Sequence, residues 1–355
     1  MYTHIALCDF TEKVLLKMGY SPAQAASGAD VLISADLRGI DSHGVIRLKD
    51  YYQLWKAGRV NASPDIKTVH ETPSTAVVDA DRALGVVAGP VAMQIAIEKA
   101  KIAGTGWVAV RNSNHYGIAG YYSLMAVQND MIGWAMTNAN PLVAPTFSID
   151  RFLGTNPIAV AIPAGTNPPF VADFATTPIA RGKIDIWDRK GLKAPTGFLQ
   201  DSKGLPTDDP SILKKGGAMI PLGSDREHGS HKGYCLAAIV DIFSSVLGGA
   251  NFGPFVPPSV AYLPVLDKKV GEGTGHFFGA MRIDAFRPAQ EFKDKMDEWI
   301  ETFRSARPAE GHDRVLIPGD PEREMETIRK KEGINLHESV VTDLKAIADE
   351  LGLQF

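Results

Sequence analysis

The chain has 355 residues, of which 45% are hydrophobic and 22% charged, a composition typical of a globular protein large enough for two lobes. Its formal net charge of -4 gives no reason to expect nucleic acid as a partner, and no apolar run reaches the roughly 18 residues of a membrane span. With only Cys8 and Cys235, and no basic-then-apolar leader, we expect a cytoplasmic protein without a disulfide framework.

The first 59 residues show two helical patterns. Ser21, Pro22 and Gln24 are an N-cap, a proline at the first helical position and a capping-box partner, so they predict a helix start. This helix should end at Gly39. Apolar residues then recur at helical spacing from residue 45 to 55, and Ser42 is predicted to cap this second helix.

His43 and Arg47 follow that predicted cap and would lie one turn apart on the same helix face, near its positive end. Arginine binds a carboxylate with two parallel hydrogen bonds, and histidine exchanges a proton near neutral pH. The pair therefore suits reduction of a 2-oxo acid or a cyclic imino acid. The alternative is a helix-capping histidine beside a solvated arginine.

The next segment predicts alternating strands and helices. Strand-like runs at 66–69 and 75–79 precede a helix that should begin at Pro90 and end at Gly104. A buried strand is predicted at 106–110.

A polar loop at 111–117, a helix at 118–127 and a strand at 131–136 complete a βαβ unit with that buried strand. Ligands of such sheets bind beyond the carboxyl ends of the strands, which makes His115 in the loop a candidate site residue. A loop histidine bonded to backbone is the alternative.

Repeated prolines exclude long helices between residues 138 and 209. Apolar runs at 158–162 and 170–174 are predicted strands. The second run leads into small and hydroxyl-bearing residues, followed by Arg181 and Lys183, which could receive a pyrophosphate or form a solvated turn.

A glycine-containing segment, 229–234, precedes a helix predicted at 235–247, and Lys232 at its start suits an anion. His228 and His231 resemble a pair of metal ligands, but no third ligand follows at a recognisable spacing. Further on, the sequence predicts a strand at 275–283, a helix at 288–307 whose aromatic stripe suits core or interface packing, and helices from 320 and over 338–351. Helices at both ends should form one lobe together.

No Gly-x-Gly-x-x-Gly motif joins a strand to a helix, and no phosphate-binding P-loop motif is present. The Rossmann geometry is therefore not expected, and a nucleotide would have to be bound in another way.

These motifs together resemble one family, the type 2 malate/L-lactate dehydrogenases, which includes sulfolactate and ureidoglycolate dehydrogenases, diketogulonate reductase and piperideine-2-carboxylate reductase. The matching stretches span nearly the whole chain: Asp41-Ser42-His43-Gly44 with Arg47, Asn112–Gly117, Gly154–Ala159, Asp173 with Ala180–Lys183, His231–Tyr234 and Pro318–Asp320. The resemblance implies an α/β fold with a three-layer, mixed-sheet nucleotide-binding core that lacks the Rossmann motif, and a homodimer.

The resemblance also implies residue roles. His43 would be the proton donor or acceptor, Arg47 the carboxylate clamp, Ser42 their neighbour, and His115 would face the reacting centre and the nicotinamide. The residues implied to bind NAD or NADP are His115, Val171, Ala172, Asp173, Phe174, Ala175, Thr176, Thr177, Arg181, His231, Lys232, Gly319, Asp320 and Pro321. No metal site is implied. Three positions depart from the family pattern: the 146–150 turn lacks glycine, Cys235 replaces a glycine, and Asp320 stands where glutamate is common.

We therefore expect an N-terminal helical part at 1–72, a mixed α/β cofactor-binding core at 73–285 and C-terminal helices at 286–355 that complete the first lobe. The expected activity is an oxidoreductase for a small 2-hydroxy or 2-oxo acid. Alternatives are a reductase of a cyclic imino acid, a metal-dependent hydrolase that uses His43, His115, His228 and His231, or a ligand-binding protein without catalysis.

Overall fold

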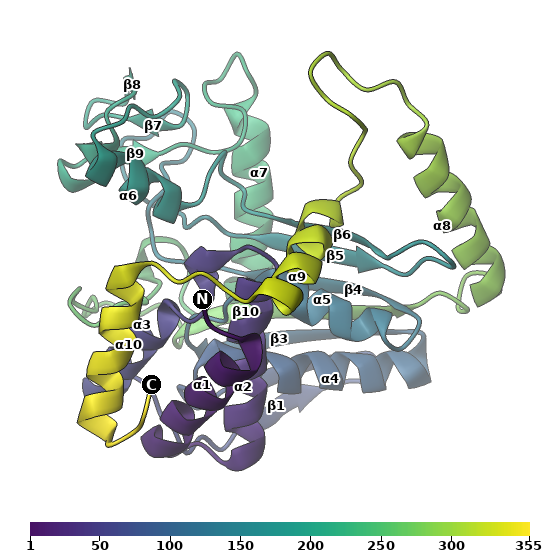
Figure 1. The fold of residues 1–355 in the computed structure, drawn as a ribbon, viewed down its shortest axis with the longest axis horizontal. Coiled ribbons are helices and arrows are strands. Elements are labelled where there is room, and N and C mark those ends of the chain that lie inside the picture. The colour runs from purple at the N-terminus through teal and green to yellow at the C-terminus, as the bar shows by residue number, and fades with distance from the viewer.

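The computed structural model describes residues 1–355 and is built on a seven-stranded mixed sheet (Figure 1). The strands lie in the order β1-β2-β3-β10-β4-β5-β6. Only β2 and β3 pair in parallel, and every other neighbouring pair is antiparallel. The strand bounds are β1 Lys67–Glu71, β2 Thr75–Asp79, β3 Thr105–Ser113, β4 Met131–Thr137, β5 Ile158–Ile162, β6 Phe170–Phe174 and β10 Thr274–Arg282.

Strand β10 lies between β3 and β4 and pairs antiparallel with both. Strands β3 and β4 therefore run in the same direction, as the predicted βαβ unit requires, but they are separated by a strand that comes much later in the chain. The loop predicted to begin at residue 111 begins later, because β3 continues to Ser113.

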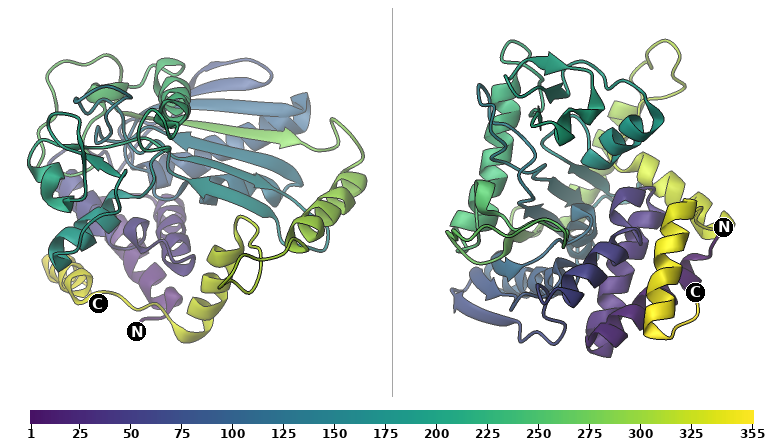
Figure 2. Two further views of the ribbon diagram at one scale, coloured as in Figure 1. Left: turned by 90° about the horizontal axis from the view of Figure 1, so that it is seen from above. Right: turned by 90° about the vertical axis from the view of Figure 1, so that its left-hand side faces the viewer.

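Helices cover both faces of the sheet, and side-chain alternation along β3 shows which helix lies on which face. Val108 and Val110 belong to the main hydrophobic core with α4 (Gly85–Ala103) and α5 (Ala119–Val127). Ala109, between them, packs in a separate cluster with Val240 of α7 (Ser230–Asp241). The arrangement is helix, sheet, helix, and the two further views in Figure 2 show the helices on either side of the strands.

The two ends of the chain lie side by side (Figures 1 and 2). Tyr2 forms an isolated β-bridge with Ile334, and Phe355 packs against Tyr2 and Phe10. The helices concerned are α1 His4–Met18, α2 Pro22–Leu37, α3 Arg47–Lys56, α9 Asp320–Glu332 and α10 Glu338–Leu351. One 47-residue cluster joins buried residues of α1, α2, α3 and α10 to those of the sheet, so the terminal helices share its core.

A smaller region stands on one side of the main sheet. It holds α6 (Arg181–Lys190) and three short strands in the order β8-β7-β9, with a separate seven-residue hydrophobic cluster. The strands are β7 Leu199–Gln200, β8 Pro206–Thr207 and β9 Ala218–Met219. The sequence did not predict α6, whose ten residues lie between prolines that exclude only longer helices.

Helix α8 (Ala289–Arg304) lies at the margin of the molecule (Figure 1). Only Ile300 of this helix is fully buried. Trp299 stacks on Phe303 and meets Phe170 edge-to-face, yet both α8 aromatics remain substantially exposed. The aromatic side chains of α8 therefore do not belong to the hydrophobic core of this chain.

Two predicted helix starts are wrong by five residues. Helix α4 begins at Gly85, so Pro90 lies inside it and costs one backbone hydrogen bond because proline has no N–H. Helix α7 begins at Ser230, immediately after Gly229 with φ of 100°, and continues into a π-helical segment, Ile242–Val246.

No helix combines the length and apolar character needed to cross a membrane. Cys8 and Cys235 are free thiols.

Candidate active site

The turn that carries His43 differs from its predicted form. Residues Asp41–His43 form a short 3-10 turn, and α3 begins only at Arg47. The prediction that Ser42 caps this helix is wrong, since Ile46 occupies the cap position without a side-chain hydrogen bond. The Ser42 hydroxyl instead lies 2.9 Å from His43 Nδ1, and its carbonyl accepts from Arg47 Nε at 2.7 Å. Residues 41–47 are called the catalytic turn below, after the role that the resemblance implies for His43 and Arg47.

Arg47 is held in place while part of its guanidinium stays available. Its Nε donates to the Ser42 carbonyl and its Nη1 to Asp50 Oδ2 at 3.1 Å. The third nitrogen, Nη2, makes no hydrogen bond within the protein, and the side chain is partly exposed. A carboxylate could therefore bind this guanidinium without displacing the bond that fixes the side chain.

His115 lies against His43 although 72 residues separate the two in sequence. The ring centroids are 5.5 Å apart and the ring planes are inclined by 23°. The Tyr51 hydroxyl lies 2.8 Å from His115 Nδ1, and the Gly117 N–H points at the same nitrogen from 3.3 Å. An N–H can only donate, so Nδ1 is an acceptor and Tyr51 donates to it. The hydrogen bonds thus assign the proton of neutral His115 to Nε2, which leaves an N–H for a ligand.

The backbone around His115 explains the motif at 112–117. The Asn114 amide donates to the carbonyls of Arg82 and Ala83, both at 3.0 Å, and the His115 carbonyl accepts from Gly85 N at 3.1 Å. Gly117 has a φ of 77°, which residues with a side chain rarely adopt. The end of β3 is therefore tied to the start of α4, and His115 is placed by fixed backbone.

Burial and charge keep both imidazoles neutral. Burial, followed by the positive charge of Arg47, lowers the pKa of His43 to about 3. The pKa of His115 is lowered well below its usual value by burial, then by Arg47 and His43. A carboxylate bound to Arg47 would offset the guanidinium charge and raise both pKa values. The site is therefore built so that binding an acid makes its histidines more basic.

We expect that His115 is no longer restricted to one tautomer in Tyr51→Phe. The variant keeps the buried ring but loses the hydrogen bond to Nδ1, so a second tautomer becomes populated and the free energy of unfolding falls by about 1 kcal/mol. Imidazole ¹⁵N chemical shifts and chemical denaturation measure the two effects. Tyr52→Phe is the matched control, because the Tyr52 hydroxyl bonds Glu350 of α10 and does not contact His115. Unchanged His115 shifts in Tyr51→Phe would contradict the assigned tautomer.

The structure brings two of the implied cofactor residues, Val171 and Gly319, together and places a third, Arg181, close to the catalytic turn. Val171 N donates to the Pro318 carbonyl at 3.0 Å, which places Gly319 against Val171. Gly182, next to Arg181 at the start of α6, lies against Ser42: a Cβ on this glycine would be 3.4 Å from that of Ser42. The positive end of α6 thus adjoins the catalytic turn.

The other implied cofactor residues of β6 and its end are mostly bonded to the protein itself. Thr176 is buried and its hydroxyl donates to the carbonyls of Thr155 and Asn156. Asp173 accepts from Gly120 N at 2.7 Å, at the start of α5, and burial raises the pKa of this carboxyl to about 6. These contacts orient the end of β6.

Asp320 and His231 also have partners within the chain. The Asp320 carboxylate accepts from Arg304, Arg323 and the backbone N–H of Ile317. His231 lies 2.8 Å from Arg226 Nη1. Lys232, in the first turn of α7, is exposed and has no ion-pair partner, so it is free to meet an anion.

The residues required by a metal-dependent hydrolase do not converge. His43 and His115 lie together, whereas His228 contacts Asp225 and His231 faces a guanidinium. Nowhere in the chain do three or more histidine, cysteine or carboxylate side chains gather in an arrangement that could hold a metal ion.

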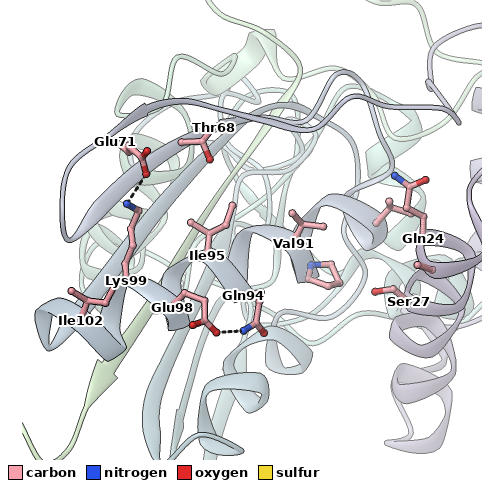
Figure 3. Close-up of a pocket in the computed structure, with 13 residues that line it drawn as sticks. Gln24, Ser27, Thr68, Glu71, Val91, Gln94, Ile95, Glu98, Lys99 and Ile102 are labelled. Carbon is pink, nitrogen blue, oxygen red and sulfur yellow. Dashed lines mark hydrogen bonds and ion pairs between the residues drawn. The ribbon is translucent and has the colours of Figure 1, made fainter.

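Two hollows of the surface lie away from the catalytic turn. One, of about 680 Å³, lies between the start of α2, β1 and α4, where Ser27, Val91 and Lys99 contribute to its lining (Figure 3). The other, of about 440 Å³, lies beside Arg304, Arg314 and Arg323. Neither is lined by His43, Arg47 or His115.

Two residues of this region were missed from the sequence. Tyr51 follows Arg47 by one turn of α3 and was assigned to an apolar face, although its hydroxyl orients His115. Asp36, within α2, accepts a hydrogen bond from Val45 N in the catalytic turn. Its position inside a predicted helix gave no indication of that contact.

Comparison with known proteins gives concordant matches over nearly the whole chain. Residues 3–345 match a family model described as malate/L-lactate dehydrogenase. The chain is 43% identical to a malate dehydrogenase of Pyrococcus abyssi, covering 98% of this chain and 94% of the relative. It is 42% identical to an L-sulfolactate dehydrogenase of Methanocaldococcus jannaschii, covering 96% and 94%. The structure of a malate dehydrogenase from Entamoeba histolytica superposes with a TM-score of 0.92 at 37% identity, covering 99% of this chain and 98% of the other.

Proposed function

The chain belongs to the malate/L-lactate dehydrogenase family, and on this premise we propose that it interconverts a small 2-hydroxy acid and its 2-oxo acid with NAD or NADP. The observation that carries the proposal is the grouping of Arg47 with two neutral, stacked imidazoles within one site. The malate and sulfolactate specificities of the relatives both concern small acids with a carboxylate beside the reacting carbon, which a guanidinium can orient.

The residues around the site fit a nicotinamide dinucleotide. Its pyrophosphate is an anion, and the positive ends of α6, α7 and α9 lie at Arg181, Lys232 and Gly319. Some N–H groups of these first turns, such as those of Ser230 and Asp320, already bond backbone carbonyls. Gly319 has a φ of 98° and no side chain, which suits close approach of the backbone to a ligand. The nicotinamide, when bound, supplies or accepts the hydride.

The protein's own contribution is binding and proton transfer. Arg47 would bind the carboxylate of the acid through its free guanidinium edge, which orients the neighbouring carbon. Neutral His43 would take the proton of the substrate hydroxyl during oxidation and return it to the oxygen during reduction. His115, with its Nε2–H, would donate a hydrogen bond to the same oxygen and stabilise the charge that develops there.

The test is a substrate panel. Oxidation of NADH and of NADPH is followed by absorbance, separately, with pyruvate, oxaloacetate, sulfopyruvate and cyclic imino acids. We expect turnover with at least one 2-oxo acid. Turnover with an imino acid alone would favour the reductase alternative. Binding of these acids without any oxidation of either cofactor would overturn the proposal in favour of a non-catalytic protein.

We further infer a homodimer. Support comes from an outward stripe on α7 and the following π-helical segment, which consists of Cys235, Ile239, Ile242 and Val246 on successive turns. All four are exposed, and Val246 has 58% of its surface accessible to solvent. A contiguous apolar strip of this kind on a helix is typical of a protein–protein contact.

We expect Ile242→Glu to produce monomers, since a charge in the stripe would have to be buried without a partner. Light scattering after size exclusion should give twice the chain mass of 38.3 kDa for the wild type and the single mass for the variant. Ile5→Glu is the control, because Ile5 is an exposed isoleucine on α1, outside the stripe. A wild-type chain that elutes as a monomer, or an Ile242→Glu dimer, would exclude this interface.

A further inference from the structure

The first part of the catalytic turn, residues 41–44, has few backbone hydrogen bonds of its own. His43 N donates to the Ile40 carbonyl at 2.9 Å, but the next bond, from Gly44 N to the Asp41 carbonyl, is long at 3.4 Å. A single 3-10 turn of three residues does not hold its shape alone, because its hydrogen bonds are few and poorly aligned. Arg47 is tied to Ser42 within the turn, so what must be fixed from outside is the position of the turn as a unit, with His43 on it.

Asp36, in the last turn of α2, supplies the first external contact. Its side chain is buried, with 1% of the residue exposed, and Oδ2 accepts from the Val45 backbone N–H at 2.8 Å. Burial raises the pKa of this carboxyl to about 7, although the bond from Val45 opposes the shift. No side chain donates to this carboxyl, so its hydrogen bond from the Val45 backbone is the one that it makes.

Gly44 shows how close this contact is. A Cβ built on Gly44 would lie 1.9 Å from Asp36 Oδ1 and 2.1 Å from its Cγ. The glycine of the Asp-Ser-His-Gly stretch is therefore required by the approach of this carboxyl and not by its own φ of -84°. The turn is packed directly onto Asp36.

Arg329, near the end of α9, supplies the second external contact. Its Nη1 donates to the Asp36 carbonyl and to the Asp41 carboxylate, and its Nη2 lies 3.2 Å from Asp41 Oδ2. The beginning of the catalytic turn is thus held at Asp41, and its end at Val45. His43 lies between these two anchors.

We propose that Asp36 is the positioning residue for the catalytic turn and that Arg329 is its second anchor. Asp36 acts through the Val45 N–H and touches neither substrate nor cofactor. Loss of this acceptor lets the turn shift, and a displacement on the scale of 1 Å is enough to cost about 10²-fold in rate. The effect on turnover rests on the proposed function, whereas the effect on His43 geometry does not.

The experiment compares Asp36→Asn with Asp36→Leu. Both side chains are close in size to aspartate, but only asparagine keeps an oxygen that can accept from Val45. We expect kcat of Asp36→Asn to stay near the wild-type value and that of Asp36→Leu to fall roughly 10–100-fold, with the dissociation constant of NADH unchanged in both. Equal losses in the two variants, or no loss in either, would overturn the proposal.

Imidazole ¹⁵N shifts give a readout that needs no substrate. With the His43 resonance assigned by comparison with His43→Gln, the shift should move in Asp36→Leu and remain in place in Asp36→Asn. If the wild type oxidises no 2-oxo acid, the proposed function fails while this measurement still decides the role of Asp36. An unmoved His43 resonance in Asp36→Leu would refute that role.

Arg329→Met covers the case in which Asp36→Leu does not fold, because this side chain lies nearer the surface. The His43 resonance should shift and kcat should fall, with NADH binding retained. Lys330→Met is the matched control: it removes the adjacent cation of α9, which pairs only with Glu326 on the same helix. If Arg329→Met has the same His43 chemical shift and the same kcat as Lys330→Met, Arg329 is not an anchor of the catalytic turn and this part of the proposal is overturned.

Discussion

Replacing His43 with alanine is expected to lower kcat for the 2-oxo acid by roughly 10³–10⁴-fold while NADH still binds with nearly its wild-type affinity. Proton transfer by a positioned side chain contributes on this scale, and the His43 ring and the Arg47 guanidinium both bond Ser42, which keeps them close together. The ring makes one hydrogen bond within the protein, to Ser42 next to it, so its removal should leave the fold intact. Steady-state kinetics give kcat, and quenching of protein fluorescence gives the NADH affinity.

The His43→Ala result also decides whether His43 or His115 transfers the proton. His115 Nδ1 accepts from Tyr51 and Gly117, so neutral His115 carries its proton on Nε2 and cannot accept one there. The Ser42 hydroxyl can donate to or accept from His43 Nδ1, so His43 can gain and lose a proton at Nε2. His312→Ala, at an exposed position, is the control for loss of an imidazole. A His43→Ala protein that turns over normally but no longer binds NADH would assign His43 to the cofactor and not to proton transfer.

Arg47→Met is expected to raise KM for the acid and to lower kcat/KM by about 10²–10³-fold. Loss of a charged, two-point hydrogen bond from a partly buried site costs on the order of 3–4 kcal/mol. The substitution also removes the positive charge that lowers the pKa values of His43 and His115, so both pKa values should rise in the free protein.

Arg47→Lys tests the geometry separately from the charge. Lysine keeps the positive charge but cannot form the planar, two-point contact, so kcat/KM should lie between those of the wild type and Arg47→Met. The measurement is the dependence of initial rate on the acid concentration at saturating NADH. An unchanged KM in Arg47→Met would show that the carboxylate binds elsewhere.

The parts of the fold that follow local rules were predictable. The last helix has the predicted bounds, 338–351, and the Ser21–Gln24 capping box is present in full. Strands at 158–162 and 170–174 are also confirmed, because apolar runs bounded by turn residues have few alternatives. In each case the deciding interactions lie within a few residues of one another.

The helix starts that proved wrong depend on distant contacts. Pro90 looked like a first helical residue, but the chain enters α4 earlier because Gly85 N donates to the His115 carbonyl. Ser42 looked like a cap, but its hydroxyl and carbonyl bond His43 and Arg47. Local preference was overridden by tertiary structure at both positions.

The residues of the site were predictable where they lie close together in sequence. His43 and Arg47 are near each other in sequence, and their chemistry could be inferred from residue type. The contact of Tyr51 with His115 spans 64 positions and depends on how α3 packs against the β3–α5 loop. No periodicity or spacing within one element can report such a contact.

The position of β10 governs the order in which the molecule can form. This strand starts at Thr274 and fills the gap between two strands made more than 130 residues earlier, so until it emerges during synthesis both of their inner edges lack partners. The nascent chain must carry those unpaired edges while more than a third of its residues are still being added, when the edges are open to wrong pairing and aggregation. A chain truncated before residue 274 would lack the central strand of the sheet and not an edge strand, so the main sheet cannot be completed until β10 has been made.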